Sequence, residues 1–333
     1  MPKVSIIVPV FNGESYVRRS LETVFKQDFE DYEIIVVDDG SCDETYNIVA
    51  DLLKRVKSEK FSTKLIHQKN DGVGGARNTG LKVATGKYLV FFDADDLMSS
   101  VFLCKLYNLA ESSKSEITFC GFDNADGRGK VIENYTDNYS YVHDGTSGPE
   151  VALEMLYGRV WLLVSNAIYR ADHLQKYSLR FTPGCIYGED YEFVIKALSL
   201  AHSVSCMQEP LMLYVQRRGS IHSSTSSTKL FHLLGVKKRL LCFLQRANAP
   251  HQHKELIEAR LIPEVFLKTL QTLVKEHTPR RRMKQILANP ETTKNLLRVA
   301  DNDKVKMITS FLIRHFPHFF LRSCVILERM RNH

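Results

Sequence analysis

Three short, mostly apolar segments lie within the first hundred positions. The first two are rich in β-branched residues, and a helical pattern follows each of these two. The apolar segments are residues 4–8, 33–37 and 88–92, and apolar side chains recur at helical spacing within residues 17–24 and 48–56. Strands that alternate with helices usually pair in parallel and are covered on both faces. This order therefore predicts an α/β fold with a mostly parallel sheet flanked by helices.

Acidic residues stand where two of these segments end. Asp38 and Asp39 follow residues 33–37, and residues 93–96 place three carboxylates directly after the third segment. Ligands of open α/β sheets bind beyond the carboxyl ends of the strands, so we expect these side chains to converge there with Asn12. Buried carboxylates are costly when unpaired, and Mg²⁺ or Mn²⁺ would relieve that cost while contacting substrate phosphates.

A structural role is the alternative for two of these carboxylates. A helix that starts near Ser99 would be capped by Asp95 and Asp96, because anionic side chains are favoured at a helix N-terminus. The cluster alone leaves both interpretations open.

A glycine-rich segment, residues 69–80, separates the two acidic strand ends. Its glycines would let the backbone approach a ligand closely, and Arg77 offers a planar donor fork for phosphate or carboxylate. The alternative is a flexible loop that caps the following helix. No dinucleotide-binding fingerprint is present, because Arg77 stands where the third glycine belongs.

Five motifs occur in order at residues 8–14, 36–41, 75–80, 92–96 and 188–190. Each motif is weak by itself, but the ordered set resembles the family-2 inverting glycosyltransferases of GT-A fold. The resemblance covers roughly the first two thirds of the chain. It implies a Rossmann-like GT-A sheet that binds a nucleotide sugar.

The resemblance also implies roles for individual residues. Asp39 corresponds to the carboxylate that receives the base, Asp93 to the carboxylate near the ribose, and Asp95 to the main protein ligand of Mn²⁺ or Mg²⁺. A cation there would stabilise the charge that develops on the leaving diphosphate. The other residues assigned to the nucleotide-sugar pocket are Pro9, Val10, Phe11, Asn12, Glu14, Gly72, Arg77 and Ala94.

The last motif supplies the predicted catalytic base. Residues 193–200 have the apolar spacing of a helix, which places Glu189 and Asp190 in its first turn. In the resembled family the Asp of this pair removes the proton from the acceptor hydroxyl, and one in-line displacement needs a single base. Asp190 is therefore the predicted base, and Glu189 is predicted to bind or orient the acceptor. Stabilisation of carboxylates at a helix N-terminus is the structural alternative.

Four further residues are candidates for contacts with acceptor, phosphate or metal. Trp161, the only tryptophan, is either an aromatic wall or a platform for a sugar. Arg217 and Arg218 follow an apolar strand at residues 211–215 and are predicted to contact phosphate, as a basic loop does in many relatives. His222 is a predicted additional metal ligand, with an ordinary surface histidine as the alternative.

Composition divides the chain near a polar stretch at residues 220–228. We assign residues 1–222 to a GT-A catalytic domain, in which residues 1–97 bind the nucleotide sugar and residues 98–222 bind the acceptor. Residues 223–333 are predicted to form a helical, basic C-terminal region.

The positive charge of the chain is concentrated near its C-terminus. Residues 251–333 carry 16 Lys and Arg against 8 Asp and Glu. Residues 307–322 contain both aromatic side chains and cations, but Arg314 and Arg322 would each cost roughly 3 kcal/mol at a bilayer centre, and Pro317 interrupts the helix. The pattern predicts peripheral contact with an anionic membrane, and a helical cap on the catalytic domain is the alternative. Nothing resembles a module that reads bases, so nucleic acid is not an expected partner.

The sequence therefore predicts a metal-dependent inverting glycosyltransferase. The donor is expected to be a UDP-sugar, and the acceptor a glycan or lipid-linked hydroxyl in bacterial surface polysaccharide synthesis. The seven cysteines lack Cys-x-x-Cys spacing and no signal peptide precedes Met1, which predicts a cytoplasmic location or the inner face of the membrane.

Two other functions are weighed against this one. A sugar-phosphate nucleotidyltransferase would need a glycine-rich basic loop after the first strand, where this chain has residues 9–14. A non-catalytic nucleotide-sugar-binding subunit would not need Asp95 and Asp190 together.

Overall fold

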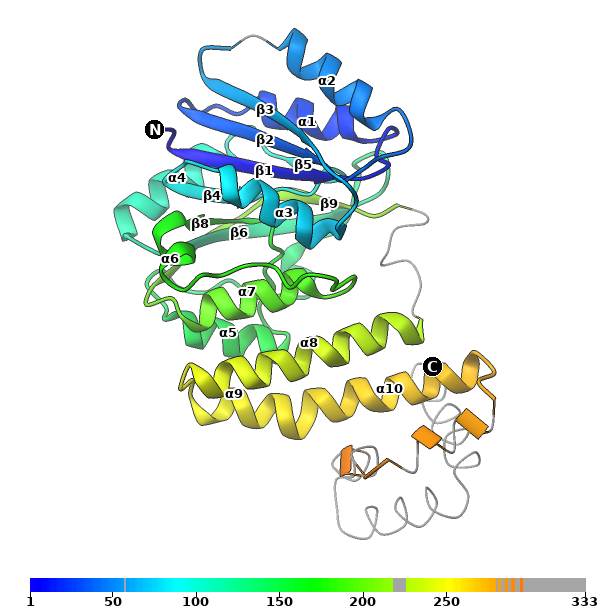
Figure 1. Cartoon of the computed structure of the whole chain (residues 1–333). Helices are drawn as coiled ribbons and strands as arrows, with labels where there is room; N and C mark the ends of the chain where they lie inside the picture. Colours follow the sequence, from blue (N-terminus) through cyan, green and yellow to red (C-terminus); the bar gives the residue numbers. More distant parts are fainter. Residues whose placement is uncertain are drawn as a thin grey trace. The chain divides into compact units, whose positions relative to one another are not determined.

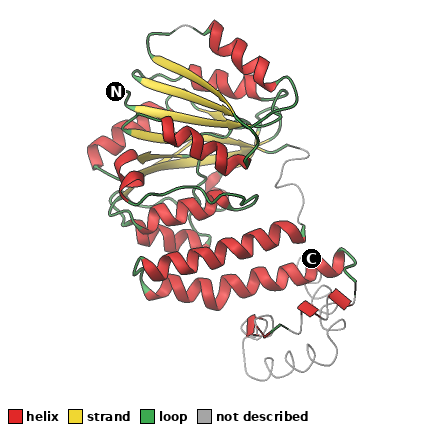
Figure 2. Cartoon of the chain, viewed as in Figure 1, coloured by secondary structure: helices red, strands yellow, loops and turns green. Residues whose placement is uncertain are grey.

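The computed structural model describes residues 1–56, 58–217 and 226–279, together with the pairs 281–282, 285–286, 289–290 and 294–295. The chain divides into two compact units, Met1–Ser220 and Ile221–His333. The first unit combines a sheet with helices, and the described part of the second unit is helical (Figures 1 and 2).

The first unit is built on a sheet in which nine strands are described, in the order β3-β2-β1-β4-β8-β6-β9-β5, with β7 paired to β6. The strands are β1 (Val4–Val10), β2 (Tyr32–Asp38), β3 (Phe61–His67), β4 (Tyr88–Phe91), β5 (Leu97–Met98), β6 (Ile117–Ala125), β7 (Val131–Glu133), β8 (Ala167–Arg170) and β9 (Val204–Val215). The pairs among β1 to β4 are parallel, as is β6 with β9, whereas the pairs of β8 with β4 and β6 are antiparallel. The predicted mostly parallel α/β sheet is confirmed.

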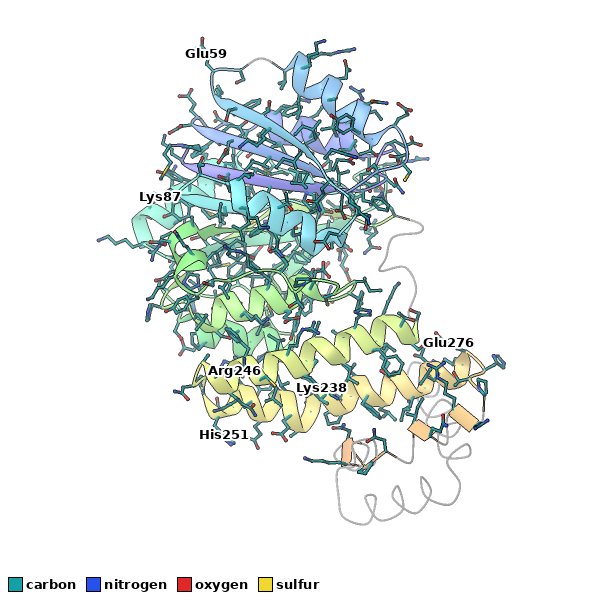
Figure 3. The ribbon with its side chains drawn as sticks, in the orientation of Figure 1. Glu59, Lys87, Lys238, Arg246, His251 and Glu276 are labelled. Carbon is teal, nitrogen blue, oxygen red and sulfur yellow. The ribbon has the colours of Figure 1, made fainter. Side chains whose placement is uncertain are left out.

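Strand register aligns the carboxyl ends of the first three strands. Val10 of β1 pairs with Asp38 of β2, and Asp38 pairs with His67 of β3. The loops that follow these strands therefore leave the sheet at one edge, which is the edge where ligands bind in such sheets. The opposite edge lies near Lys87, which precedes β4 (Figure 3).

Helices cover both faces of this sheet. The helices of the first unit are α1 (Val17–Phe25), α2 (Thr45–Arg55), α3 (Gly72–Val83), α4 (Phe102–Ser113), the 3₁₀ turn η1 (Tyr135–Asp137), α5 (Gly148–Tyr157), α6 (Ala171–Lys176) and α7 (Glu189–Ser199). Ile6 packs in the core with Leu21 of α1 and Leu106 of α4. On the other face α3 lies directly on β1, because a Cβ at Gly80 would meet Ile7 Cγ2 at 2.3 Å. Close contact at Gly80 fixes α3, and with it Arg77, above the sheet.

Two features differ from the expectations drawn from sequence. The polar edge strand β3 was not predicted, because an edge strand pairs on one side only and does not need an apolar pattern. The suggestion that Asp95 and Asp96 cap a helix near Ser99 is wrong. Strand β5 follows them directly, and α4 begins only at Phe102 without a side-chain cap.

The second unit contains α8 (Ser227–Arg246), α9 (His251–Leu256), the π-helical turn η3 (Ile257–Leu261) and α10 (Ile262–Lys275). Helices α8 and α10 lie side by side (Figure 3). The backbone N–H of Ser227 donates to Glu276 Oε1 at 2.9 Å. The predicted C-terminal helical extension is confirmed in this part. Among the helices that the structure describes, none combines the length and apolarity needed to cross a bilayer. Residues 307–322 lie outside the described residues.

Candidate active site

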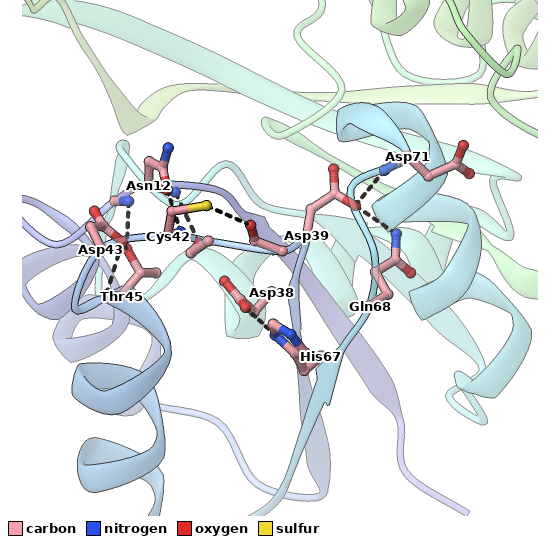
Figure 4. Close-up of polar contacts among 12 residues, drawn as sticks. Asn12, Asp38, Asp39, Cys42, Asp43, Thr45, His67, Gln68 and Asp71 are labelled. Carbon is pink, nitrogen blue, oxygen red and sulfur yellow. Dashed lines mark hydrogen bonds and ion pairs between the residues drawn. The ribbon is translucent and has the colours of Figure 1, made fainter.

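Asp39 presents one oriented carboxylate oxygen at the carboxyl end of β2. Its side chain is almost completely buried, and Oδ1 accepts hydrogen bonds from Gln68 Nε2 at 2.7 Å and from the backbone N–H of Asp71 at 2.9 Å (Figure 4). None of the described residues donates a hydrogen bond to Oδ2. That oxygen is therefore the one that can accept an N–H from a ligand.

Asp38 supports this strand end from the opposite side of the backbone. Its carboxylate is fully buried, and Oδ2 lies 2.5 Å from His67 Nδ1 at the end of β3 (Figure 4). The His67 ring also meets the ring of Tyr46 edge-on. Asp38 thus joins the ends of β2 and β3.

The loop after β1 is held against the loop after β2. Asn12 adopts a left-handed conformation with φ of 48°, its N–H donates to Ser41 Oγ at 2.9 Å, and Cys42 N–H donates to Asn12 Oδ1 at 2.8 Å. Glu14 Oε2 accepts from Glu44 N–H at 3.1 Å. Two residues predicted for the nucleotide pocket therefore lie beside the Asp39 loop.

The remaining predicted pocket residues fall into two groups. Pro9, Val10 and Ala94 are buried in or directly after β1 and β4. Phe11 is 45% exposed, and Gly72 begins α3 with φ of 77°. A side chain is strained at that φ, so the backbone there favours glycine.

Three carboxylates crowd the segment between β4 and β5. Burial raises the pKa of Asp95, and Asp93 raises it further, while Arg217 opposes both effects. Burial also raises the pKa of Asp96 well above its ordinary value, with added repulsion from Asp95 and Asp93. Asp96 Oδ1 accepts from Val215 N–H at 3.0 Å, but its buried Oδ2 has no hydrogen-bond partner among the described residues. Such a segment is stabilised by any cation that reaches it.

The cation that reaches Asp95 in this structure is Arg217. Its guanidinium forms an ion pair with Asp95 Oδ2 and lies over the Tyr16 ring, 3.6 Å from the ring centroid. Both charged side chains remain about 30% exposed, at 27% and 31%. Arg217 follows β9 and Tyr16 follows the Asn12 loop, so this contact ties three strand ends together.

The donor set at the end of β4 fits a hard divalent cation. It consists of carboxylate oxygens alone, and the repulsion among Asp93, Asp95 and Asp96 favours added positive charge. No group of three or more His, Cys, Asp or Glu within the described ranges is arranged to hold a metal by itself. A cation bound to Asp95 would therefore need oxygens from substrate phosphate and water, as is usual for Mg²⁺.

Arg77 lies buried between two carboxylates. Its Nη2 donates to Asp93 Oδ1 at 2.6 Å and its Nη1 donates to Glu189 Oε1 at 3.0 Å, with the side chain 3% exposed. The guanidinium also lies over the Phe181 ring, at 5.1 Å. Arg77 thus connects the end of β4 with the start of α7.

Glu189 and Asp190 occupy the first turn of α7, as predicted. Burial and the neighbouring Asp190 raise the pKa of Glu189 to about 7, although Arg77 lowers it. Asp190 is partly exposed, and its Oδ1 contacts the N–H of Tyr191 at 2.7 Å. Because Glu189 is committed to Arg77, Asp190 is the more accessible carboxylate of the pair.

Four of these carboxylates act electrostatically on one tyrosine. The pKa of Tyr214 on β9 is raised first by burial and then by the negative charges of Asp96, Asp95, Asp93 and Asp190. The carboxylates at the end of β4 and the carboxylate on α7 therefore share one neighbourhood, although about 95 positions of sequence separate them.

Trp161 belongs to a row of aromatic rings beside α7. Its ring stacks on Tyr139 at a centroid distance of 6.1 Å and on Tyr191 at 5.6 Å. It also packs against the hydrophobic core. These contacts fit the wall interpretation, and sugar stacking stays a prediction.

The structure brings together most residues predicted for the site, from Asn12 and Asp39 to Asp95 and Asp190. Arg218 and His222 lie outside the described residues. The sequence analysis predicted no role for Gln68, which donates a hydrogen bond to Asp39. It also predicted none for Tyr16, whose ring packs against the Arg217 guanidinium. Gln68 follows the strand that was not predicted, and Tyr16 carries no pattern that sets it apart from a core aromatic.

Comparison with known proteins assigns the chain to a family. Residues 5–164 match the family model described as Glycosyl transferase family 2. The uncharacterized glycosyltransferase EpsJ of Bacillus subtilis is 31% identical over 227 residues, which cover 66% of this chain and 63% of that protein. Poly(ribitol-phosphate) β-N-acetylglucosaminyltransferase TarS of Staphylococcus aureus is 27% identical over 275 residues, covering 80% of this chain and 44% of TarS. The chain thus spans less than two thirds of the length of both relatives.

Solved structures share its fold. TarS 1–349 in complex with UDP-GlcNAc superimposes with a TM-score of 0.73 at 22% identity, covering 98% of this chain and 92% of that one. The mannosyltransferase PcManGT of Pyrobaculum calidifontis, in complex with GDP-Man and Mn²⁺, gives a TM-score of 0.55 at 16% identity, with 98% and 86% coverage. The predicted GT-A fold is confirmed by this likeness. Through residues 5–164, the chain belongs to glycosyl transferase family 2.

Proposed function

We propose that the chain transfers a sugar from a UDP-sugar to an acceptor hydroxyl with inversion of the anomeric carbon. The observation that carries this proposal is that Asp39 and Asp95 follow strands at the same edge of the sheet, while Arg77 joins Asp93, two residues before Asp95, to Glu189 beside Asp190. The complex of the structural neighbour TarS with UDP-GlcNAc supports a nucleotide-sugar donor of this class.

The donor would lie across the ends of β1, β2 and β4. The free Oδ2 of Asp39 accepts the N–H of a uracil ring, and the partly exposed carboxylate of Asp93 accepts a ribose hydroxyl. Asp95 would hold Mn²⁺ or Mg²⁺, which supplies positive charge for the leaving diphosphate. Arg217, once released from Asp95, is placed to donate to the same phosphates.

Asp190 would act as the general base. Its carboxylate takes the proton of the acceptor hydroxyl while that oxygen forms a bond to the anomeric carbon. The bond from the anomeric carbon to the diphosphate oxygen breaks in the same step. A single displacement of this kind inverts the configuration and needs one base, which Asp190, the more accessible member of the Glu189–Asp190 pair, provides.

The acceptor is proposed to be a growing surface glycan or its lipid-linked precursor. The relative TarS, whose name describes transfer to poly(ribitol-phosphate), supports a polymeric acceptor. Peripheral contact with an anionic membrane stays a prediction from sequence, because residues 307–322 lie outside the described residues.

A nucleotide-sugar panel tests the proposal. Purified protein is incubated with UDP-GlcNAc, UDP-glucose, UDP-galactose or GDP-mannose, with Mn²⁺ or with a chelator, and release of the nucleoside diphosphate is measured. We expect Mn²⁺-dependent release of UDP, with water as the acceptor, from at least one UDP-sugar and none from GDP-mannose. Failure to bind UDP and to hydrolyse any member of the panel would contradict the proposed function.

A further inference from the structure

Two neighbouring polar residues of helix α3 contact residues 181–189, which lead into α7 and include its first residue. Arg77 donates to Glu189 and lies over the Phe181 ring, as described above. Asn78 forms a reciprocal pair with the backbone of Phe181: its Nδ2 donates to the carbonyl oxygen at 2.9 Å, and its Oδ1 accepts from the N–H at 3.0 Å. Arg77 and Asn78 therefore hold both ends of the segment that leads into α7.

Close packing makes this contact stiff. A Cβ added at Gly74 of α3 would lie 3.3 Å from Phe181 Cβ and 3.7 Å from Glu189 Cγ. The Phe181 ring in turn stacks on Phe193 of α7 at 4.2 Å. Since α3 itself lies on β1 through Gly80, the start of α7 is fixed relative to the sheet.

Arg77 has little capacity left for a substrate. Both of its terminal nitrogens are engaged by carboxylates, from Asp93 on one side and Glu189 on the other. The side chain is 3% exposed, and its Nε is buried without a hydrogen-bond partner in the described part of the chain. A guanidinium in this position can fix two acids in one geometry, which the planar fork of Arg does better than Lys.

We propose that Arg77 and Asn78 are positioning residues that hold the catalytic carboxylate pair of α7 in register with the donor carboxylate Asp93. This inference rests on the proposed function. It differs from the role that the sequence resemblance implied, in which Arg77 contacts the nucleotide sugar directly. In the new role Arg77 fixes the position of Glu189 relative to Asp93. Asp190 is positioned with it, because Asp190 directly follows Glu189 in α7.

The experiment separates nucleotide binding from turnover. Arg77→Met, Arg77→Lys and Asn78→Ala are compared with wild type by UDP calorimetry and by UDP release from the UDP-sugar that wild type hydrolyses. For Arg77→Met we expect kcat to fall about 100-fold, the scale reported for small misplacements of catalytic groups. The Kd for UDP should stay within about threefold of wild type, because the Asp39 and Asp95 contacts remain.

If Arg77→Met fails to fold, Arg77→Lys and Asn78→Ala test the proposal instead. Arg77→Lys keeps the charge but cannot bridge both acids, so it should recover part of the lost kcat. Asn78→Ala keeps Arg77 and should lower kcat without changing UDP affinity. Arg159→Met is the matched control, because it removes an exposed bidentate pair with Glu154 and should behave as wild type.

The pH dependence of kcat is a further measurement, because a general loss of packing around α7 would not shift it. The groups that face Glu189 are Asp190 on its own helix, Tyr187 in the preceding loop, and Arg77 with Asp93 behind it. Arg77 lowers the pKa of Glu189, so its loss should raise the pKa of Glu189. The acid limb of the kcat profile should then move to higher pH in Arg77→Met and stay in place in Arg159→Met.

Two outcomes would overturn the inference. If UDP affinity falls as far as kcat, Arg77 is a nucleotide ligand; if Arg77→Lys and Asn78→Ala turn over as wild type does, the contacts to α7 do not position the base. Both outcomes leave wild-type turnover intact, whereas failure of the proposed function would appear as a wild-type protein that releases no UDP.

Discussion

Replacing Asp190 by Asn should abolish sugar transfer while leaving UDP binding within about twofold of wild type. The substitution keeps the shape of the side chain but removes its ability to take a proton. General bases contribute about 10²- to 10⁴-fold to rate, so a loss of kcat in this range is expected. The nucleotide contacts at Asp39 and Asp95 come from other elements and should be unaffected. Parallel calorimetry with UDP and assays of UDP release measure the two quantities.

Asp172→Asn is the matched control for this variant. Asp172 is an exposed partner of Arg170 at the start of α6, so its amide variant should transfer sugar normally. An Asp190→Asn protein that turns over at the wild-type rate would show that the base lies elsewhere on the molecule. Glu189 would then be the next residue to examine.

Replacing Asp95 and replacing Arg217 should change the binding of Mn²⁺ in opposite directions. In wild type we expect Mn²⁺ to strengthen UDP binding at least tenfold, or about 1.4 kcal/mol, and Asp95→Asn should remove this gain. Arg217→Gln frees Asp95 from its ion pair and should strengthen binding of Mn²⁺ alone. The pair is partly exposed and worth at most about 1 kcal/mol, so the gain should be about two- to fivefold.

Electron paramagnetic resonance of free Mn²⁺ measures the metal without nucleotide, and calorimetry measures UDP with and without Mn²⁺. Arg19→Gln is a suitable control, because Arg19 donates to the carbonyl oxygens of Gly127 and Arg128 and contacts no carboxylate in the described structure. Unchanged Mn²⁺ affinity in Arg217→Gln would mean that Arg217 and the metal do not compete. An intact Mn²⁺ effect in Asp95→Asn would place the cation on other ligands.

Local sequence pattern predicted where the candidate residues lie along the strands and helices. Asp39 and Asp93 follow apolar strand segments, and such segments end at the edge of a parallel sheet where ligands bind. Asp190 precedes a run with helical spacing, which sets it in the first turn of α7. In each case a short segment contains all the information needed.

Contacts between distant segments were not predicted. Arg77 pairs with Glu189 across 112 positions, and Arg217 pairs with Asp95 across 122 positions. Each Arg has several acidic residues within plausible reach in any fold of this class, so tertiary packing alone selects the partner. The polar strand β3 was missed for a related reason, since its edge position leaves its side chains exposed and removes the apolar pattern.

A crystal structure of the full chain with UDP and Mn²⁺ tests the central claim most directly. The account predicts uracil against the free oxygen of Asp39, Mn²⁺ between Asp95 and the diphosphate, and Arg217 moved away from Asp95 toward the phosphates. Asp190 should face the side of the diphosphate where the sugar would stand. UDP bound elsewhere, for example in the cavity lined by Arg170, His173 and Lys176, with the Asp95–Arg217 pair intact, would contradict it.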